Sequence, residues 1–380
     1  MAKECKNLAT NLIRQVSKYD DIVIVGIWHN ALHAYCFLKH TGKPIHFCAD
    51  VLEHQFKGNR IYGVLEASRV FPNALFCLAL DNNGNEAHRN KLISLGVNKE
   101  NFLTSDEVAS IVKDTDKFFP REYIYHLDIA VAEHCNLNCV CCNVFAPLVK
   151  EEVFIDYNTL ENDLTRLREL CPNDGDIGIL QFLGGEPLLN PSVNKILAMA
   201  RKIFPLTRFI LITNGLLLPK MQDDFFDTCR ENNVEIHITR YPVKFDYNAA
   251  VEMCRSKNVK AFIFFDGSRD EMVHHRYDLD GNQDMNTSFS NCMISNDCLK
   301  LHKGRIYTCA PSCHIDRFND YFNVNLPISD NDSIDIYKAK SKEEILEFLS
   351  NPIQLCKHCI TSGLEMQKWH VAKKEISEFL

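Results

Sequence analysis

The chain has 380 residues, of which 46% are hydrophobic and 17 are cysteine, and its formal net charge is −8. This length predicts two or three domains, and the hydrophobic share is sufficient for their cores. The acidic balance lacks the basic surface that nucleic-acid binding requires, so small or neutral substrates fit better. No charged leader with an apolar segment follows Met1, and no apolar run is long enough to span a bilayer. We therefore expect a cytoplasmic protein, with no nucleic-acid or membrane partner, whose thiols are reduced or metal-bound.

The first segment, which we place at residues 1–115, alternates strands with helices. Strand patterns occupy residues 22–25, 45–48 and 75–80, and a helix pattern lies near 86–95. This alternation is typical of a doubly wound parallel sheet, so we expect a Rossmann-like domain. The turn after the first strand begins at Gly26 but lacks two glycines of the phosphate-binding fingerprint. The segment weakly resembles small Rossmann domains attached to sugar-nucleotide-modifying enzymes, and a docking or oligomerisation domain is an equal alternative.

The second segment, residues 116–270, repeats strand and helix several times. Its strand patterns lie at residues 123–132, 176–183, 208–213, 234–239 and 261–265, and amphipathic helix patterns lie at 159–170 and 191–203. This α/β order predicts a partial (β/α)6 barrel of the TIM type. Active-site residues of such barrels lie at the carboxyl ends of the strands. The segments that follow the first four strands should therefore meet at one mouth.

The loop after the first of these strands carries Cys135, Cys139 and Cys142 in a C-x3-C-x2-C spacing. Three thiolates bind three irons of a [4Fe–4S] cluster and leave the fourth iron open, whereas a structural cluster or a closed zinc site uses four ligands. The next strand ends in Gly184-Gly185-Glu186-Pro187. On these two motifs the segment resembles the radical S-adenosylmethionine (SAM) enzymes, whose open iron binds SAM and whose cluster cleaves it to a 5'-deoxyadenosyl radical. Zinc binding and redox-active thiols are the alternatives.

The resemblance also implies which residues hold SAM. Gly184 and Gly185 would let the backbone approach a ligand, and Glu186 would accept hydrogen bonds from its ammonium group. The residues that would contact its ribose or carboxylate are Asn214, Thr239 and Arg240. As simpler alternatives, the asparagine is a turn residue and the arginine a surface cation.

The chain departs from the family pattern just before the third cysteine of the loop. Members of the family often carry an aromatic residue there, which packs against adenine. Here Cys141 occupies that position and Phe145 lies just beyond. Cys141 is then a spare thiol or an alternative ligand, and the adenine contact is left open.

The third segment, residues 271–380, is a small cysteine-rich domain. Its opening spacing, from Cys292 through Gly304 to Cys309, resembles the SPASM and twitch extensions that hold auxiliary iron–sulfur clusters. A hairpin turn at Gly304 would bring Cys298 close to Cys309. By this resemblance one auxiliary [4Fe–4S] cluster is expected, because the cysteines are too few for two fully ligated clusters. The expected ligands are Cys292, Cys309, Cys356 and Cys359, with Cys298 as the substitute; a zinc site with four thiolates is the alternative.

Three functions fit these features. The first is a radical SAM enzyme that takes hydrogen from a sugar, nucleotide sugar or polyol, for dehydrogenation or epimerisation, with a flavodoxin- or ferredoxin-type reductant. The second is a radical SAM peptide or protein maturase, and the third is an iron–sulfur electron carrier without enzymatic activity. The polar candidates for a substrate pocket are His237, Tyr241, His274, His275 and Cys313. Of these, we expect Cys313, His237 and Tyr241 to be catalytic; a structural role is the alternative for each.

Overall fold

The structure is a computed structural model that describes residues 14–26, 31, 34–35, 38–49, 55–56, 59–80, 82–105, 107–108, 123–264, 270–292, 294–295 and 298–380. The chain forms two compact units, one within residues 1–122 and the other within 123–380. From Tyr123 onward, the predicted second and third segments both lie in the second unit, and the boundary between them stays a prediction. Among the described residues, no helix combines the length and the apolar character that crossing a membrane requires.

The first unit contains a sheet with strand order β3-β4-β2-β1-β5-β6. All pairings are parallel except the one between β3 and β4. Ile22 and Ile24 belong to the core on one face of β1, whereas Val23 and Val25 belong to the core on the other. A parallel sheet that is buried on both faces confirms the predicted Rossmann-like fold. The elements are β1 (Ile22–Val25), β2 (Ile45–Cys48), β3 (Gln55–Phe56), β4 (Asn59–Tyr62), α3 (Val64–Val70), β5 (Leu75–Leu78), α4 (Asn82–Ser94) and β6 (Phe102–Thr104).

The turn after β1 is described only at its first residue, because residues 27–30 lie outside the described residues. Gly26 has a φ of 125°, and its N–H donates to the carbonyl oxygen of Cys48 at 2.8 Å. A Cβ atom at this position would lie 2.9 Å from the carbonyl oxygen of Ala79. The packing of neighbouring strands therefore accounts for this glycine, without a bound phosphate.

The second unit is built on an open sheet with strand order β11-β10-β9-β8-β7-β13-β14-β15. The strands from β11 to β13 are parallel, and β14 and β15 are antiparallel to their neighbours. The predicted partial barrel is confirmed, with β13 from the third segment as its sixth parallel strand. The bounds are β7 (Ile124–Ala132), β8 (Ile177–Gly184), β9 (Arg208–Thr213), β10 (Val234–Thr239), β11 (Ala261–Phe264), β13 (Lys300–His302), β14 (Arg305–Tyr307) and β15 (Ser333–Asp335).

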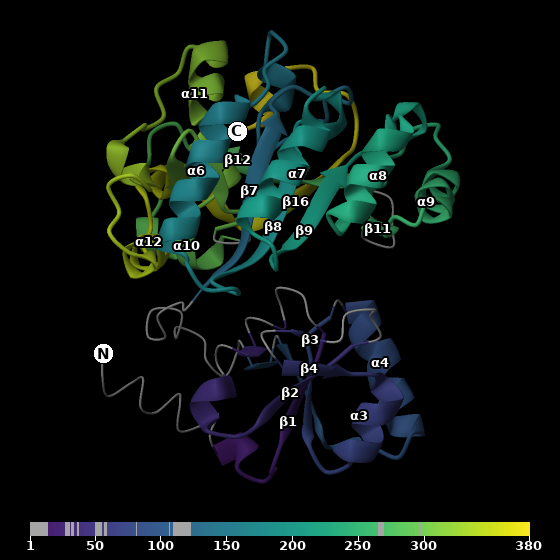
Figure 1. The fold of residues 1–380 in the computed structure, drawn as a ribbon. Coiled ribbons are helices and arrows are strands. Elements are labelled where there is room, and N and C mark those ends of the chain that lie inside the picture. The colour runs from purple at the N-terminus through teal and green to yellow at the C-terminus, as the bar shows by residue number, and fades with distance from the viewer. Residues whose placement is uncertain are drawn as a thin grey trace. The chain divides into compact units, whose positions relative to one another are not determined.

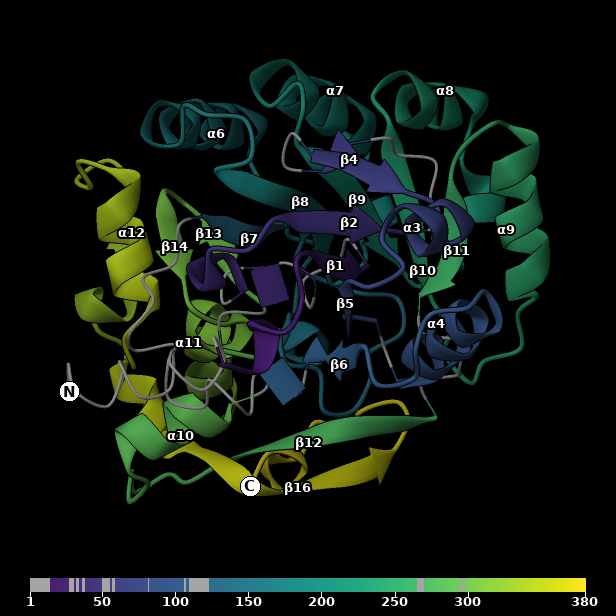
Figure 2. The same cartoon turned by 90° about the horizontal axis from the view of Figure 1, so that it is seen from below.

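Helices cover the outer face of this arc of strands (Figures 1 and 2). They are α6 (Tyr157–Leu170), α7 (Val193–Ile203), α8 (Asp223–Glu231) and α9 (Tyr247–Ser256). α6 begins at its cap Asp156, whose carboxylate accepts the N–H of Thr159 at 2.8 Å. Leu164 of α6 packs in one core with Leu127 and Ile129 of β7. Because side chains alternate across a strand, the residue between Leu127 and Ile129 faces the inner side of the arc.

The β13–β14 hairpin confirms the predicted turn. Lys303 and Gly304 both have positive φ angles, 46° and 73°, as a two-residue turn of this hand requires. The carboxylate of Asp163 on α6 binds this turn. One of its oxygens accepts the N–H of Gly304 at 2.8 Å, and the other accepts the hydroxyl of Tyr337 at 2.8 Å. The hairpin is thereby fixed to the barrel helices.

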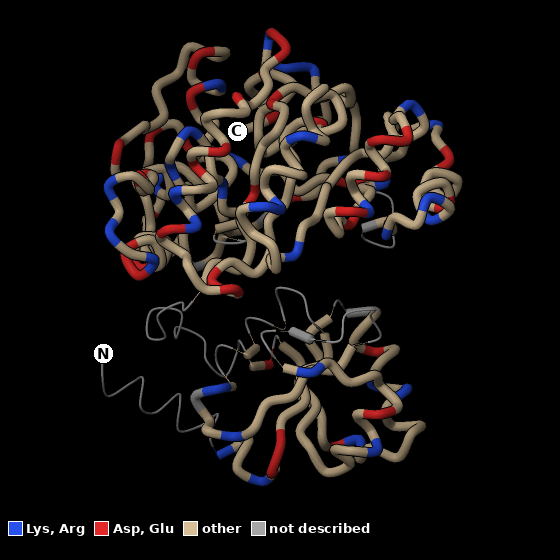
Figure 3. Tube along the Cα trace, viewed as in Figure 1, with Lys and Arg blue, Asp and Glu red and all other residues tan. Residues whose placement is uncertain are grey.

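The remaining elements pack beside the arc. An antiparallel ribbon of β12 (Glu271–Tyr277) and β16 (Cys359–Lys368) runs along one side of it (Figure 2). The helices are α10 (Met285–Asn291), α11 (Ala310–Phe322) and α12 (Lys342–Leu349). Short 3-10 helices are η1 (Lys39–Thr41), η3 (Ala146–Leu148), η4 (Pro187–Leu189), η5 (Leu218–Lys220), η6 (Asp330–Asp332), η7 (Gln354–His358) and η8 (Ile376–Glu378). Charges of both signs are interspersed over the helices and loops of the second unit (Figure 3).

Candidate functional site

Two glycines let the end of β8 lie directly against the cysteine loop. Gly184 has a φ of 142°, and a Cβ atom there would collide with the carbonyl oxygen of Ala132. A Cβ atom at Gly185 would collide with the carbonyl oxygen of His134. The N–H of Gly185 donates to Ala132 at 2.8 Å, and that of Glu186 donates to His134 at 3.0 Å. The close approach that the glycines permit is thus to the backbone of the loop, whereas the predicted approach to a ligand stays a prediction.

Glu186 connects three segments at the mouth of the arc. Its side chain is buried, and Oε1 accepts the Thr213 hydroxyl at 2.6 Å and the Leu188 N–H at 3.1 Å. Oε2 accepts the backbone N–H of Asn214 at 2.9 Å. Burial raises the pKa of Glu186 to about 7, although these three donors lower it. The carboxylate therefore organises the strand ends, and its predicted contact with a ligand ammonium group stays a prediction.

The three cysteines of the loop lie in sulfur-compatible surroundings. Cys135 and Cys142 pack against one apolar group formed by Val144, Ala146 and Ala310. The backbone N–H of Leu137 donates to the sulfur of Cys135 at 3.4 Å. Burial raises the pKa of Cys135 to about 11, and a negative charge on Cys142 raises it further. Backbone N–H groups that point at sulfur, in an apolar setting, suit the thiolates of an iron–sulfur cluster.

Cys141 has a side-chain partner on the C-terminal ribbon. It has a φ of 55°, and its thiol donates to Oε1 of Gln367 on β16 at 3.0 Å. Phe145 is 1% exposed and packs with Tyr277 and Phe318 in a separate core. Cys141 thus has a partner of its own, and Phe145 is committed to a core, so neither takes the place of the aromatic residue that the family pattern has before the third cysteine.

The chain that follows β16 runs along the cysteine loop, which the sequence did not predict. The N–H of Val140 donates to the carbonyl of His370 at 3.0 Å, and the N–H of Ala372 donates to the carbonyl of Asn138 at 2.8 Å. Cys139 and Val371 form an isolated antiparallel bridge. The loop is therefore held between β8 on one side and the C-terminal segment on the other.

Two buried ring nitrogens at this loop have no hydrogen-bond partner in the structure. Nδ1 of His134 contacts the backbone of Val153, with 3.1 Å to its N–H nitrogen and 3.3 Å to its carbonyl oxygen, whereas Nε2 is buried and unpartnered. Nε1 of Trp369 is also buried and unpartnered, and its ring packs against the cluster formed by Leu137, Val140 and neighbouring residues. A buried donor without a partner costs about 1–3 kcal/mol. The Trp369 N–H therefore fits a polar acceptor at the loop, such as the sulfides of a cluster or a ligand bound to it.

The residues predicted to contact SAM, at the ends of β9 and β10, differ in their burial and in their hydrogen-bond partners. Nδ2 of Asn214 donates to Oδ1 of Asn136 at 2.7 Å, so the amide fixes the cysteine loop. Thr239 is buried at the end of β10, whereas Arg240 is exposed. Tyr241 packs in the apolar cluster around the loop, with its ring 6.3 Å from that of Trp369. All of these residues follow a strand end, as predicted, and an exposed guanidinium at this edge can reach a carboxylate.

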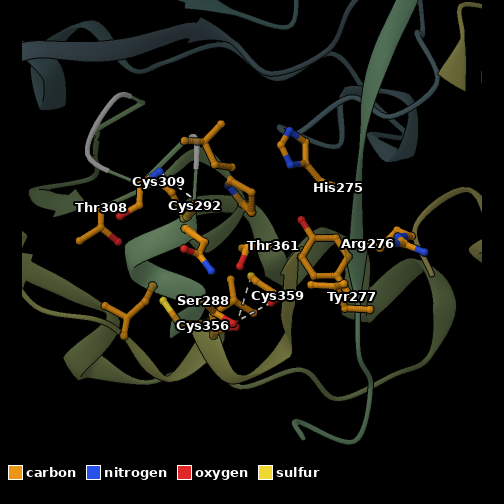
Figure 4. A pocket seen from close by; sticks show the side chains of 17 residues that line it. His275, Arg276, Tyr277, Ser288, Cys292, Thr308, Cys309, Cys356, Cys359 and Thr361 are labelled. Carbon is orange, nitrogen blue, oxygen red and sulfur yellow. Dashed lines mark hydrogen bonds between the residues drawn. The ribbon is translucent and has the colours of Figure 1, made fainter. Parts of the chain in front are cut away.

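A second group of cysteines surrounds a cavity in the C-terminal part of the chain. Cys292, Cys309, Cys356 and Cys359 line it together with Tyr277 (Figure 4). The space between its walls, including its opening, is about 610 Å³. These are the four cysteines that were expected to hold an auxiliary cluster. They come from the end of α10, the start of α11, the middle of η7 and the first residue of β16, so the fold brings together residues far apart in the sequence.

The thiols around this cavity affect one another's ionisation. Burial raises the pKa of Cys309 to about 11 and that of Cys356 to about 12, and negative charge on Cys292 contributes to both shifts. The pKa of the Tyr277 phenol is raised well above its usual range by burial and by the charges of Cys359, Cys309 and Cys292. Thiols that oppose one another's ionisation ionise readily once a metal cation is present. Four thiols are the donor type of both iron–sulfur clusters and zinc, although these four are not spaced to share one metal ion in the structure.

Cys298, the proposed substitute ligand, is not among the residues that line this cavity. It packs against Val144 and Ala310, the group that Cys135 and Cys142 also contact. The predicted hairpin is present, but Cys309 lines the cavity, whereas Cys298 packs against a different group of residues. The structure thus favours the ligand set without Cys298. Within the described part of the chain, no group of three or more His, Cys, Asp or Glu side chains is spaced to share one metal ion.

The candidates for the substrate pocket are dispersed. His237 is buried, and its Nε2 lies 3.3 Å from a carboxylate oxygen of Glu235; burial lowers the pKa of His237. Cys313 is buried on α11, and its pKa is raised by burial and lowered by Lys300 and Arg317. His275 lines the cysteine cavity. His274 has a buried Nε2 without a partner. Only Tyr241 among the candidates packs directly at the cysteine loop, and the catalytic roles stay predictions.

A family model matches the middle of the chain, and curated relatives match a part of it. Residues 129–246 match the model described as the Radical SAM superfamily. A "GTP 3',8-cyclase" of Clostridium acetobutylicum is 33% identical over 101 residues, which are 27% of this chain and 30% of the relative. "Molybdenum cofactor biosynthesis protein 1" of Bos taurus is 33% identical over 135 residues, 34% of this chain and 20% of that protein. The chain thus spans less than a third of the length of these relatives.

Solved structures show weaker likenesses. A crystal structure of BtrN in complex with AdoMet and 2-DOIA has a TM-score of 0.39 at 20% identity, covering 63% of this chain and 93% of BtrN. A structure of anSMEcpe with bound AdoMet has a TM-score of 0.29 at 23% identity, covering 36% of this chain and 42% of that one. Likenesses with such scores do not bear on the substrate of this chain.

Proposed function

Residues 129–246 belong to the radical SAM superfamily, whose cofactors are a [4Fe–4S] cluster and SAM, and from this premise we propose that the chain is an enzyme that takes hydrogen from a hydroxyl-bearing carbon of a sugar, nucleotide sugar or polyol. One observation carries the proposal: three cysteines are fixed on one loop, between the glycines of β8 and the C-terminal segment, beside two buried ring nitrogens that lack partners. Three ligands leave an open position for SAM.

The chain's own residues hold and orient these cofactors. Cys135, Cys139 and Cys142 would ligate the first cluster, while Asn214 and Glu186 fix the loop and the strand ends around it. The exposed Arg240 would hold the carboxylate of SAM. SAM bound there supplies a 5'-deoxyadenosyl radical when an electron arrives from a flavodoxin- or ferredoxin-type reductant.

We assign the second cysteine group to an auxiliary [4Fe–4S] cluster, with Cys292, Cys309, Cys356 and Cys359 as ligands. Loss of one hydrogen atom from an alcohol carbon leaves one electron and one proton to remove before a carbonyl forms. An auxiliary cluster supplies a one-electron acceptor, and the hydroxyl proton leaves to solvent. Dehydrogenation therefore fits the two sites better than epimerisation does. Epimerisation would return a hydrogen atom to the carbon, and the buried thiol of Cys313 is the candidate donor of that atom.

A nucleoside triphosphate is the second candidate substrate, favoured by the names of the curated relatives. The similarity to the Clostridium acetobutylicum protein covers only 27% of this chain. The segment that carries the four-cysteine cavity lies beyond the family match, which ends at residue 246. The comparison thus concerns the part that all members use for SAM, and it leaves the substrate-binding part to this chain's own residues.

Deuterium transfer tests the proposal. The reconstituted protein is incubated with SAM, a reductant and sugar-type substrates that carry deuterium at the candidate carbinol carbon. We expect label in 5'-deoxyadenosine together with a carbonyl product. Label transfer into 5'-deoxyadenosine with an alcohol product of inverted configuration, in which hydrogen has replaced the deuterium, would show epimerisation instead. Transfer only from labelled GTP, or only from a labelled peptide, would overturn the carbohydrate assignment.

A further inference from the structure

One charged pair lies on the inner face of the arc, where the cofactor ligands do not use it. Leu127 and Ile129 of β7 face the helices, so Asp128 faces inward; Leu299 and Leu301 place Lys300 of β13 inward in the same way. Asp128 and Lys300 are register partners on neighbouring parallel strands. Asp128 is a charged residue in an otherwise largely apolar strand, and this contrast makes the position recognisable in the sequence.

The pair is buried but leaves one oxygen unused. Asp128 is 3% exposed and Lys300 is 2% exposed, and Nζ donates to Oδ2 of the aspartate at 2.8 Å. Oδ1 of Asp128 is buried and has no hydrogen-bond partner. Nε2 of His126 lies 3.9 Å from that oxygen, which is too far for a hydrogen bond. A purely structural ion pair in a dry core normally uses all its acceptors, because an unsatisfied buried oxygen is costly.

A second polar side chain lies on the neighbouring strand, on the same face of the sheet as Asp128. Gln181 of β8 is the register partner of Asp128 on the other side of β7, and Leu180 and Phe182 face the helices, so Gln181 also points inward. Neighbouring strands are about 4.8 Å apart, a distance that adjacent hydroxyls of one ring can bridge. Gln181 is partly exposed, as are Leu183 and Ile212 farther along the same face, so this part of the face is accessible.

We propose that Asp128 and Gln181, with Lys300 holding the aspartate, form a subsite for two neighbouring hydroxyl groups of the substrate. One hydroxyl donates to the unused oxygen of Asp128, and the amide of Gln181 exchanges hydrogen bonds with the next. The lysine and the aspartate neutralise each other, so the subsite suits an uncharged polyol ring rather than a phosphate. The inference rests on the proposed function and specifies its substrate class by named residues.

The subsite is tested by ligand-detected NMR on the reconstituted holoprotein with SAM. The probes are myo-inositol, which has vicinal hydroxyls, cyclohexanol as a ring with one hydroxyl, and GTP. Gln181→Leu removes the amide at a half-buried position without breaking the ion pair. Gln222→Leu is the matched control, because Gln222 is exposed outside the inner face. Asp128→Asn keeps the shape of the side chain and tests the acceptor.

We expect myo-inositol to bind the wild type and Gln222→Leu, and Gln181→Leu to weaken that binding about tenfold, the worth of one hydrogen bond of this kind. Cyclohexanol should not bind measurably. Equal binding of myo-inositol to Gln181→Leu and the wild type, or binding of GTP but not of myo-inositol to the wild type, would overturn the subsite. SAM cleavage by the wild type without substrate is measured in the same samples. Absence of cleavage rejects the proposed function. Cleavage together with unchanged myo-inositol binding by Gln181→Leu rejects the subsite alone.

Discussion

The two cysteine groups of the second unit differ in how the fold assembles them. Cys135, Cys139 and Cys142 lie on a single loop, and the surrounding strands only fix its position. The cysteines of the C-terminal cavity come from separate segments between residues 292 and 359. A local group of three leaves a position open for a ligand, whereas a group of four collected by the fold closes its site. On the proposed function, the open site would activate a ligand and the closed site would accept an electron.

The C-terminal chain connects the two groups. Cys359 lines the cavity at the start of β16, and the segment after the strand pairs with the cysteine loop through His370 and Ala372. A substitution in one cysteine group can therefore affect the other group, so the iron content and the activity of both groups need to be measured.

Loss of a loop cysteine should have the largest effect. Cys135→Ala, Cys139→Ala or Cys142→Ala removes one of three ligands, so reductive SAM cleavage should fall to background. Anaerobic iron analysis should give about four irons per chain in place of about eight, since only the auxiliary cluster remains. Cys141→Ala should keep cleavage, because its thiol bonds to Gln367. An indispensable Cys141 together with a dispensable Cys142 would refute the ligand assignment.

Loss of a cavity cysteine should separate SAM cleavage from turnover. Cys309→Ala should lower iron from about eight to about four per chain. SAM cleavage should persist, while formation of the carbonyl product should stop for want of an electron acceptor. Cys298→Ala is the control and should keep the full iron content, since Cys298 does not line the cavity. Stoichiometric zinc in the wild type, lost in Cys309→Ala, would show a zinc site instead.

Glu186 should make the stability of the second unit depend on pH. Its folded pKa of about 7 lies above its usual 4.5, so the folded state binds the proton more tightly and the contribution to stability falls as pH rises from 4.5 to 7. The shift corresponds to about 3 kcal/mol of unfolding free energy. Urea unfolding of the apo protein across this range should show a pH slope that Glu186→Gln removes. The control is Glu169→Gln, at an exposed glutamate. Equal slopes in wild type and Glu186→Gln would contradict the shift.

The smallest expected effect concerns the bond between the loop and β16. A double-mutant cycle of Cys141→Ala and Gln367→Ala should give a coupling of about 1 kcal/mol in unfolding free energy, the usual net value of one hydrogen bond. Both clusters should be retained in all three variants. A coupling near zero would show that the backbone pairing of the C-terminal segment, rather than this side-chain bond, holds the loop.

The sequence predicted the features that are local in the chain. Strand bounds of the barrel, the Rossmann-like sheet and the hairpin turn at Gly304 follow from alternation, periodicity and glycine, which act over a few residues. The loop cysteines were recognisable for the same reason. The ligand set of the cavity was predicted by resemblance to a known family, and the fold confirms only that its members converge.

Features that depend on distant packing were not predictable in the same way. The place of Cys298 depends on how α11 lies against the cysteine loop, and no local pattern indicates that. The C-terminal segment pairs with the loop through backbone atoms, which carry no sequence signal. The partner of Asp128 is Lys300, far along the chain, although the isolated aspartate in an apolar strand marked the position.

Electron paramagnetic resonance of the reduced protein, with and without SAM, tests the open and closed sites most directly. We predict two [4Fe–4S] signals, of which only one shifts when SAM is added. The shifting signal should disappear in Cys142→Ala and remain in Cys309→Ala. A shift by SAM that survives in Cys142→Ala, or that is lost in Cys309→Ala while the loop cluster is intact, would contradict the assignment of the open position to the cysteine loop.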